Sequence, residues 1–142
     1  MRPIARCGAS AVGGMVASIA TLGAAIGALG CADSRPFLGD WVGRRSVPRI
    51  QGQDPYLRET LATVTLSVRK DGTFTLREEG FEKNGQWSAG RDGLTLTIRR
   101  ILDRPLSPDD PMGGARTLRK DGSGVSLHST GYEPVALSPA KP

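Results

Sequence analysis

The chain has 142 residues, enough for one ordinary domain, and carries 19 Lys and Arg against 14 Asp and Glu. A formal net charge of +5 is modest, and no dense basic cluster accompanies it, so we expect no nucleic-acid partner. Basic pairs such as Arg44-Arg45 and Arg119-Lys120 are scattered and lie mostly beside predicted turns, where solvated strand ends commonly carry charge.

The first thirty residues differ from the rest of the chain. Arg2 and Arg6 precede an uncharged run from Cys7 to Gly30, and this order of charge, apolar stretch and small residues is typical of a secretory signal. A retained transmembrane helix is the alternative, because about 20 apolar residues suffice to span a bilayer. The run is rich in Gly and Ala and has no aromatic residue, which weakens its insertion. We therefore expect residues 1–30 to be a signal peptide that is removed.

The run ends in Ala28-Leu29-Gly30-Cys31, which resembles the lipobox of bacterial lipoproteins. The resemblance implies that Cys31 is acylated and becomes the new N-terminus, with residues 31–36 as a short tether. The protein would then be anchored to a membrane of the cell envelope, on its extracytoplasmic side, because two acyl chains give stable binding. A plain buried cysteine is the alternative for Cys31.

Residues 63–69 alternate strictly between polar and apolar types, which predicts a half-buried strand. The alternation resumes after Asp71-Gly72, so two strands are expected to form a hairpin. Apolar partners must share a face, which requires a three-residue loop over residues 70–72 with a positive φ at Gly72. The expected cross-strand pairs are Val68 with Phe74 and Leu66 with Leu76.

Two further Asp-Gly pairs lie between alternating runs. The first predicts a four-residue loop over residues 90–93, and the second a four-residue loop over residues 120–123. None of the three copies offers the alternating oxygen ligands of a calcium loop. The expected pairs are Trp87 with Leu96, Ala89 with Leu94, Leu118 with Val125 and Arg116 with Leu127.

Short strands separated by turn signals predict an all-β fold, and we expect a single small antiparallel meander barrel over residues 37–138 with a disordered tail over residues 139–142. One helix is predicted at residues 54–62, with Asp54 as its N-cap and Pro55 at its first position. A long loop, residues 103–115, joins the fifth and sixth strands. The eight expected strands are residues 37–42, 61–69, 73–79, 85–89, 93–101, 115–119, 125–129 and 132–137.

Three motifs carry a resemblance to a known family: Gly39-x-Trp41, the "DGTFTL" of the first hairpin, and Gly85-x-Trp87. Together they resemble small lipocalin-like bacterial lipoproteins, including the N-terminal domain of the copper-homeostasis lipoprotein family, over about residues 37–98. The resemblance implies a lipocalin-like barrel. That family carries a Cys-x-x-Cys near the start of its domain, whereas no cysteine follows Cys31 here, so thiolate ligation of copper is not expected.

An eight-stranded barrel is wide enough to be filled by side chains or to hold one small ligand. Two functions follow. In the first, the barrel binds a small apolar or amphipathic molecule; in the second, it is a structural or signalling module that binds another envelope protein through an exposed strand edge or the 103–115 loop. The alternative for the predicted ligand residues is that they form the core. These residues are Trp41, Phe74, Trp87 and Leu96.

Residues with catalytic or metal-binding potential form no recognised arrangement. His128 is the only histidine and is out of phase with Val125 and Leu127, so it is expected to face solvent. Glu78 and Glu79 are adjacent in a predicted strand and should point to opposite faces. We therefore expect no enzyme, no metal site and no cofactor.

Overall fold

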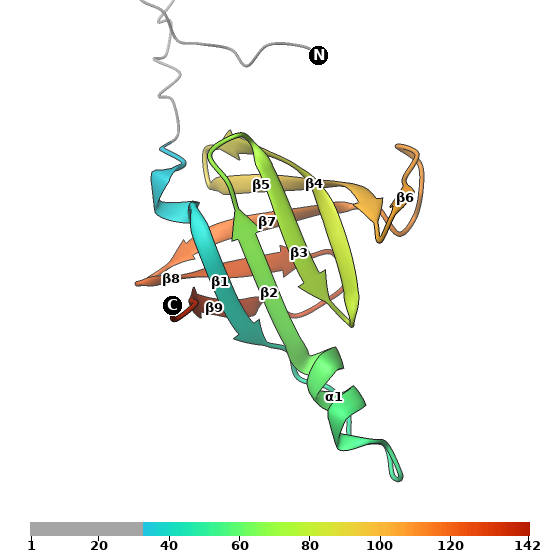
Figure 1. Ribbon diagram of the computed structural model, residues 1–142. Helices are drawn as coiled ribbons and strands as arrows, with labels where there is room; N and C mark the ends of the chain where they lie inside the picture. The colour runs from blue at the N-terminus through green and yellow to red at the C-terminus, as the bar shows by residue number, and fades with distance from the viewer. Residues whose placement is uncertain (1–32) are drawn as a thin grey trace, which may run out of the picture.

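The computed structural model describes residues 33–142, so the predictions for the signal peptide and Cys31 lie outside the described residues. Within residues 33–142, no helix is both long and apolar enough to cross a bilayer. The elements, in chain order, are η1 (Arg35–Phe37), β1 (Gly39–Arg44), α1 (Pro55–Ala62), β2 (Thr63–Val68), β3 (Thr73–Glu78), β4 (Phe81–Gly90), β5 (Gly93–Ile101), β6 (Arg104–Pro105), β7 (Ala115–Asp121), β8 (Gly124–Ser129) and β9 (Val135–Pro139) (Figure 1).

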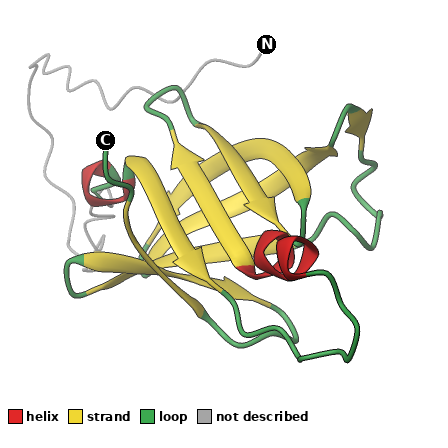
Figure 2. Ribbon diagram, turned by 60° about the horizontal axis from the view of Figure 1, so that its bottom comes forward, coloured by secondary structure: helices red, strands yellow, loops and turns green. Residues whose placement is uncertain are grey.

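The strands close into an antiparallel barrel. Eight of them form a ring in the order β1-β2-β3-β4-β5-β7-β8-β9, in which each strand pairs with the next. The pairing of β9 with β1 completes the ring. The short β6 adds to the end of β5 outside this ring. Figure 2 shows the strands curving round to enclose one interior, with α1 at one rim. The prediction of a small all-β meander barrel is confirmed, and none of these eight strands offers a long free edge to a partner.

Apolar side chains fill the interior because the strands alternate in register with one another. β2 and β5 bury every second residue, so that one face of each strand points inward. The buried apolar core comprises Phe37, Trp41, Val64, Leu66, Val68, Phe74, Leu76, Leu94, Leu96, Ile98, Ile101, Leu118, Val125, Leu127, Val135 and Leu137.

The first two hairpins have the expected registers. Val68 lies opposite Phe74, and beyond that pair the N–H of Arg69 donates to the carbonyl of Thr73 at 3.0 Å. The loop that remains is residues 70–72, with Gly72 at a φ of 89°. Trp87 lies opposite Leu96 as predicted, although the pairing continues to Gly90 and Gly93, so that the loop has two residues instead of four. The requirement that apolar partners share a face therefore fixed both registers.

The predicted register of the third hairpin is wrong. Leu118 lies opposite Leu127, because a two-residue turn that begins at Gly122, with a φ of 57°, replaces the expected four-residue loop. Lys120 consequently lies in β7 opposite Val125, with its ammonium 5.9 Å from the centre of the Trp41 ring. A lysine is tolerated at this inward position because it is at the rim, where its charge can remain hydrated.

Of the eight predicted strands, only residues 93–101 have the observed bounds. The strand predicted at residues 61–69 begins two residues later, because residues 61 and 62 end α1, and three other strands also differ clearly at their ends. Phe37 lies in η1, because Pro36 starts a 3-10 turn and Gly39 then adopts a φ of 121°, so β1 begins two residues later than expected. β4 begins at Phe81 rather than residue 85, whereas β9 begins after the turn at Pro134, which lacks an N–H for pairing. β9 runs to Pro139, and the next N–H, that of Ala140, donates to the carbonyl of Asp40 at 2.8 Å.

The predicted helix is confirmed. Asp54 is the N-cap, and its carboxylate accepts a hydrogen bond of 2.8 Å from the N–H of Tyr56. Pro55 occupies the first turn, where its missing N–H has no intrahelical partner to lose. Eight residues are too few for a helix that is stable alone, so α1 depends on this cap and on the barrel beside it.

One irregularity interrupts the pairing of β4 with β5. Asn84 lies opposite Arg100, whereas its neighbour Gly85 lies opposite Ile98, so Arg99 has no partner on β4. This is a β-bulge, in which one strand carries an extra residue. Gly85 is required at this point because a Cβ there would collide with the carbonyl oxygen of Thr97.

Replacing Gly85 with alanine should destabilise the barrel by about 1–3 kcal/mol, the usual cost of forcing an extra methyl into a packed site. The added Cβ would also lie 3.0 Å from the ring of Phe74. Urea denaturation of the full chain measures the change. Gly90→Ala is the control, because the nearest atom to its new Cβ is 3.6 Å away; equal losses for the two variants would contradict this account.

Candidate functional site

The four residues predicted to bind a ligand lie together on the inner face of the barrel. Trp41, Phe74 and Leu96 are 6%, 1% and 0% exposed and belong to the core. Trp87 is half-buried and packs against that core. Three of the four therefore belong to one cluster of buried apolar side chains, and the fourth packs against it.

Phe37 and Trp41 close the barrel end at η1. The indole of Trp41 donates a hydrogen bond of 2.9 Å to the carbonyl of Phe37, and both side chains are buried. Trp87 donates at 2.8 Å to the carbonyl of Arg69 beside the same end. Among the larger hollows of the described residues, none is lined by Trp41, Trp87 or Leu96. Ligand binding by these residues stays a prediction.

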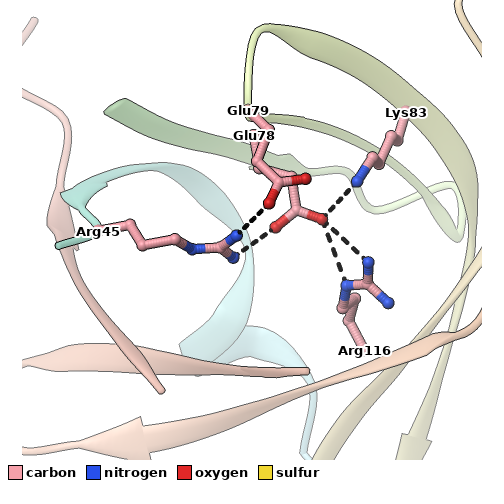
Figure 3. A network of polar contacts seen from close by, with 5 residues as sticks. All are labelled: Arg45, Glu78, Glu79, Lys83 and Arg116. Carbon is pink, nitrogen blue, oxygen red and sulfur yellow. Dashed lines mark hydrogen bonds and ion pairs between the residues drawn. The ribbon is translucent and has the colours of Figure 1, made fainter. Parts of the chain in front are cut away.

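The opposite end of the barrel interior holds a charged cluster, which we define as Arg45, Glu78, Glu79, Lys83 and Arg116 (Figure 3). The carboxylate of Glu78 is 1% exposed and lies at its centre. It accepts hydrogen bonds from Lys83 Nζ at 2.7 Å, Arg45 Nη2 at 2.8 Å and Arg116 Nη2 at 3.1 Å. The three cations come from three different parts of the barrel wall, so the cluster ties β3 to β4, to β7 and to the end of β1.

Glu79 joins the cluster against expectation. The prediction that Glu78 and Glu79 point to opposite faces is wrong, because Glu79 has left the strand and has a φ of 56°. Its carboxylate turns back and accepts a hydrogen bond of 3.1 Å from Arg45 Nη1. On its other side, the Arg45 guanidinium lies 5.0 Å from the centre of the Tyr132 ring, a cation–π contact.

Opposing effects act on the pKa of Glu78. Burial raises the pKa of the carboxyl, but the hydrogen bond from Lys83 and the charges of Lys83 and Arg116 together lower it below its usual value. Glu78 is therefore ionised at neutral pH. The cluster holds three cations and two carboxylates, and two buried polar atoms beside the ion pairs, Arg45 Nε and Ser129 Oγ, have no hydrogen-bond partner within the described part of the chain.

The contacts of Glu78 limit what its carboxylate can do chemically. Each oxygen of Glu78 is occupied by a cation, so the carboxylate is not free to act as a general base. Residues 33–142 contain no group of His, Cys, Asp and Glu side chains arranged to hold a metal ion. His128 lies half-buried on the outer face, with Nε2 2.8 Å from Ser126 Oγ.

The sequence contained a partial signal for the cluster. Glu78 is in phase with Phe74 and Leu76, so the alternation that places those two inside also places Glu78 inside. Lys83 lies opposite Leu76, but its position could be found only from the register of β3 with β4, whose strand start was not predicted. The contribution of Arg45 could not be predicted, because it follows the last residue of β1.

A different surface occupies the outside of the same barrel end. Of the residues of α1, only Ala62 is buried, and Tyr56 and Leu57 are 81% and 48% exposed. Ile50, in the loop before the helix, is 66% exposed. A bidentate ion pair between Arg44 and Glu59 connects the helix to β1, with Arg44 Nη2 2.6 Å from Glu59 Oε2. We call residues 49–58 the α1 surface. It presents large apolar side chains to solvent from an anchored element.

No protein-family model, curated protein or solved structure matches this chain.

Replacing Glu78 with glutamine should lower the free energy of unfolding by about 3–5 kcal/mol, because it leaves buried cations without their shared counter-charge. Chemical denaturation at neutral pH measures the loss. Glu82→Gln is the matched control: Glu82 pairs with Arg77 on the surface, where such pairs contribute about 0–1 kcal/mol. Similar small losses for both variants would contradict the proposed structural role of the cluster.

The pH dependence of stability should depend on the same carboxyl. Because the folded-state pKa of Glu78 is below its usual value near 4.5, its contribution is present above pH 4.5 and is lost as pH falls through the lowered value. Lys83→Met removes the main cause of the lowering, so acid unfolding, followed by circular dichroism, should move to higher pH. Arg77→Met, on the surface, should change the midpoint much less; an equal shift would count against this assignment.

Proposed function

We propose that this protein is a non-enzymatic, lipid-anchored lipoprotein of the cell envelope whose barrel binds another envelope protein through the α1 surface. The observation that carries the proposal is a contrast within the barrel. The residues expected to surround a small ligand are packed against one another, whereas large apolar side chains are exposed around α1. Exposed apolar groups that lie close together are typical of protein-binding sites, and three of the large exposed apolar residues lie within residues 50–57.

The place where the chain enters the barrel indicates how a lipid-anchored protein would be oriented at the membrane. Asp33 follows Cys31 by two residues, which span at most about 7 Å. η1 and α1 lie at opposite ends of the barrel (Figure 1). A lipid on Cys31 would therefore hold the η1 end beside the membrane and direct α1 away from it, toward proteins of the aqueous compartment.

The chemistry of the α1 surface indicates the kind of partner. Tyr56 is the most exposed large apolar residue of the described chain, and Ile50 and Leu57 lie near it in sequence. Arg49 and Arg58 border a hollow of about 370 Å³ beside Ile50. Tyrosine and arginine dominate the energetics of many interfaces. We expect a partner with an apolar groove and acidic side chains at its rim.

Site-specific photo-crosslinking in the native envelope tests this proposal. A photoreactive residue at position 57 of the full-length chain should give one discrete protein adduct, and Tyr56→Ser should reduce its yield several-fold. The same probe at Arg91, exposed on the hairpin at the η1 end, should give no such adduct.

Two results would contradict the proposal. One is equal crosslinking from positions 57 and 91. The other is a native mass, measured after gentle extraction of the full-length chain, with a small molecule that is released only on unfolding, since that result would favour the barrel as a ligand carrier. The intact mass also reports whether residues 1–30 have been removed and Cys31 acylated.

A further inference from the structure

The outer wall of the barrel carries a second surface, which the proposed function does not involve. A hollow of about 490 Å³ lies over β3, β4 and the second half of β5. Its lining includes three arginines, Arg69, Arg99 and Arg100, together with threonine, asparagine and glutamine side chains and no carboxylate. Gly85 and Phe74, one of the four residues predicted to bind a ligand, also border it. We call this hollow the arginine groove.

The β-bulge creates the groove. In a regular strand, Arg99 would point outward and Arg100 inward. Because β5 carries an extra residue at this point, both arginines are exposed, and the inward position passes to Ile101, which is 5% exposed. Two consecutive guanidinium groups thus lie on one face of the wall, as bulges elsewhere re-aim side chains at functional positions.

The arginines of the groove differ from most others in the described chain, because they have no acidic partner. Arg69 donates a hydrogen bond of 3.2 Å to the hydroxyl of Thr75, and Arg100 donates one of 3.1 Å to the carbonyl of Asp103. Ion pairs within residues 33–142 instead involve Arg35, Arg44, Arg45, Arg77, Arg104 and Arg116.

Two other basic hollows include carboxylates in their lining, whereas the arginine groove and the hollow beside Ile50 do not. The hollow at the η1 end includes Asp33 and Asp92, and the one between β1 and α1 includes Glu59. In the groove, the neutral wall is held by Thr75, which donates a hydrogen bond of 2.8 Å to Asn84 Oδ1. Two carboxylates outside the lining bond to its polar side chains: Asp71 accepts a hydrogen bond of 2.6 Å from the Thr73 hydroxyl, and Glu82 accepts one of 3.3 Å from Asn84 Nδ2. The lining itself contains positive charge and neutral polar groups.

We propose that the arginine groove binds a phosphate group. The planar fork of a guanidinium donates two parallel hydrogen bonds to a phosphate oxygen pair, and several arginines together suit a group with more than one negative charge. The phosphate can come from a free anion or from a phospholipid headgroup, and both present the same oxygens to the groove.

Titration of the full-length chain, purified in neutral detergent, with inorganic phosphate at constant ionic strength tests the free anion. Calorimetry should detect binding by the wild type and a loss of about tenfold or more in the double variant R99Q/R100Q, as expected when charge-assisted hydrogen bonds are removed. The matched control is R91Q/R119Q, which removes the same charge from the hollow at the η1 end. Both variants change exposed side chains, so both should fold.

Vesicles test the lipid source. The same proteins are compared for binding to vesicles of phosphatidylcholine with and without phosphatidylglycerol, with salt held constant because screening weakens all surface attraction. A selective loss in R99Q/R100Q, either of phosphate binding or of the preference for phosphatidylglycerol, supports the groove and identifies the source. Equal losses in the two double variants, or no binding of either probe by the wild type, would overturn the proposal. Neither result depends on the crosslinking at α1.

Discussion

The pairing of β4 with β5 closes the sheet, and this closure is the constraint on which the rest of the structure depends. Once the ring is complete, every strand must send alternate side chains into one space of fixed size. Large apolar residues fill the middle of that space. At the two ends, where the interior meets water, other side chains must cover this apolar core.

Different kinds of side chain close the two ends of the barrel. At the η1 end, the indole of Trp41 satisfies its N–H on the carbonyl of Phe37, so an aromatic pair excludes water with no unpaired donor. At the α1 end, charged side chains are buried, and desolvating them is costly unless they pair. The buried charges make the register of the strands more specific, which offsets this cost. If β3 slipped by one residue, Glu78 would move to the outer face and the cations of β4 and β7 would be left unpaired inside.

Much of the barrel could be predicted from the sequence because its hairpins follow one rule. Apolar partners must share a face, and this sufficed for Val68 with Phe74 and for Trp87 with Leu96. The rule failed at the third hairpin, where Lys120 occupies an inward position, since a charged residue at a rim gives no sign of the face it lies on. Alternation therefore predicts registers only where both strands are apolar on one side.

The surfaces with functional potential were harder to predict for the same reason. Arg99 and Arg100 read as a charged strand end, and nothing in their sequence indicates the extra residue that places both outside. The exposure of Tyr56 and Leu57 likewise depends on how little of α1 the barrel covers, which is a tertiary property. Helix boundaries, in contrast, are local, and Asp54 and Pro55 encode them directly.

The seam between β1 and β9 has a consequence for the order in which the protein matures. Trp41 lies opposite Pro139, so the first and last strands of the ring are neighbours. Contacts so distant along the chain carry a large loop-closure cost and form late. A chain that folds while it is synthesised from its N-terminus would hold an open, half-exposed sheet until β9 was complete. The barrel can therefore close only when the last strand is present. A chain that ended before β9 would leave core side chains exposed to chaperones and proteases.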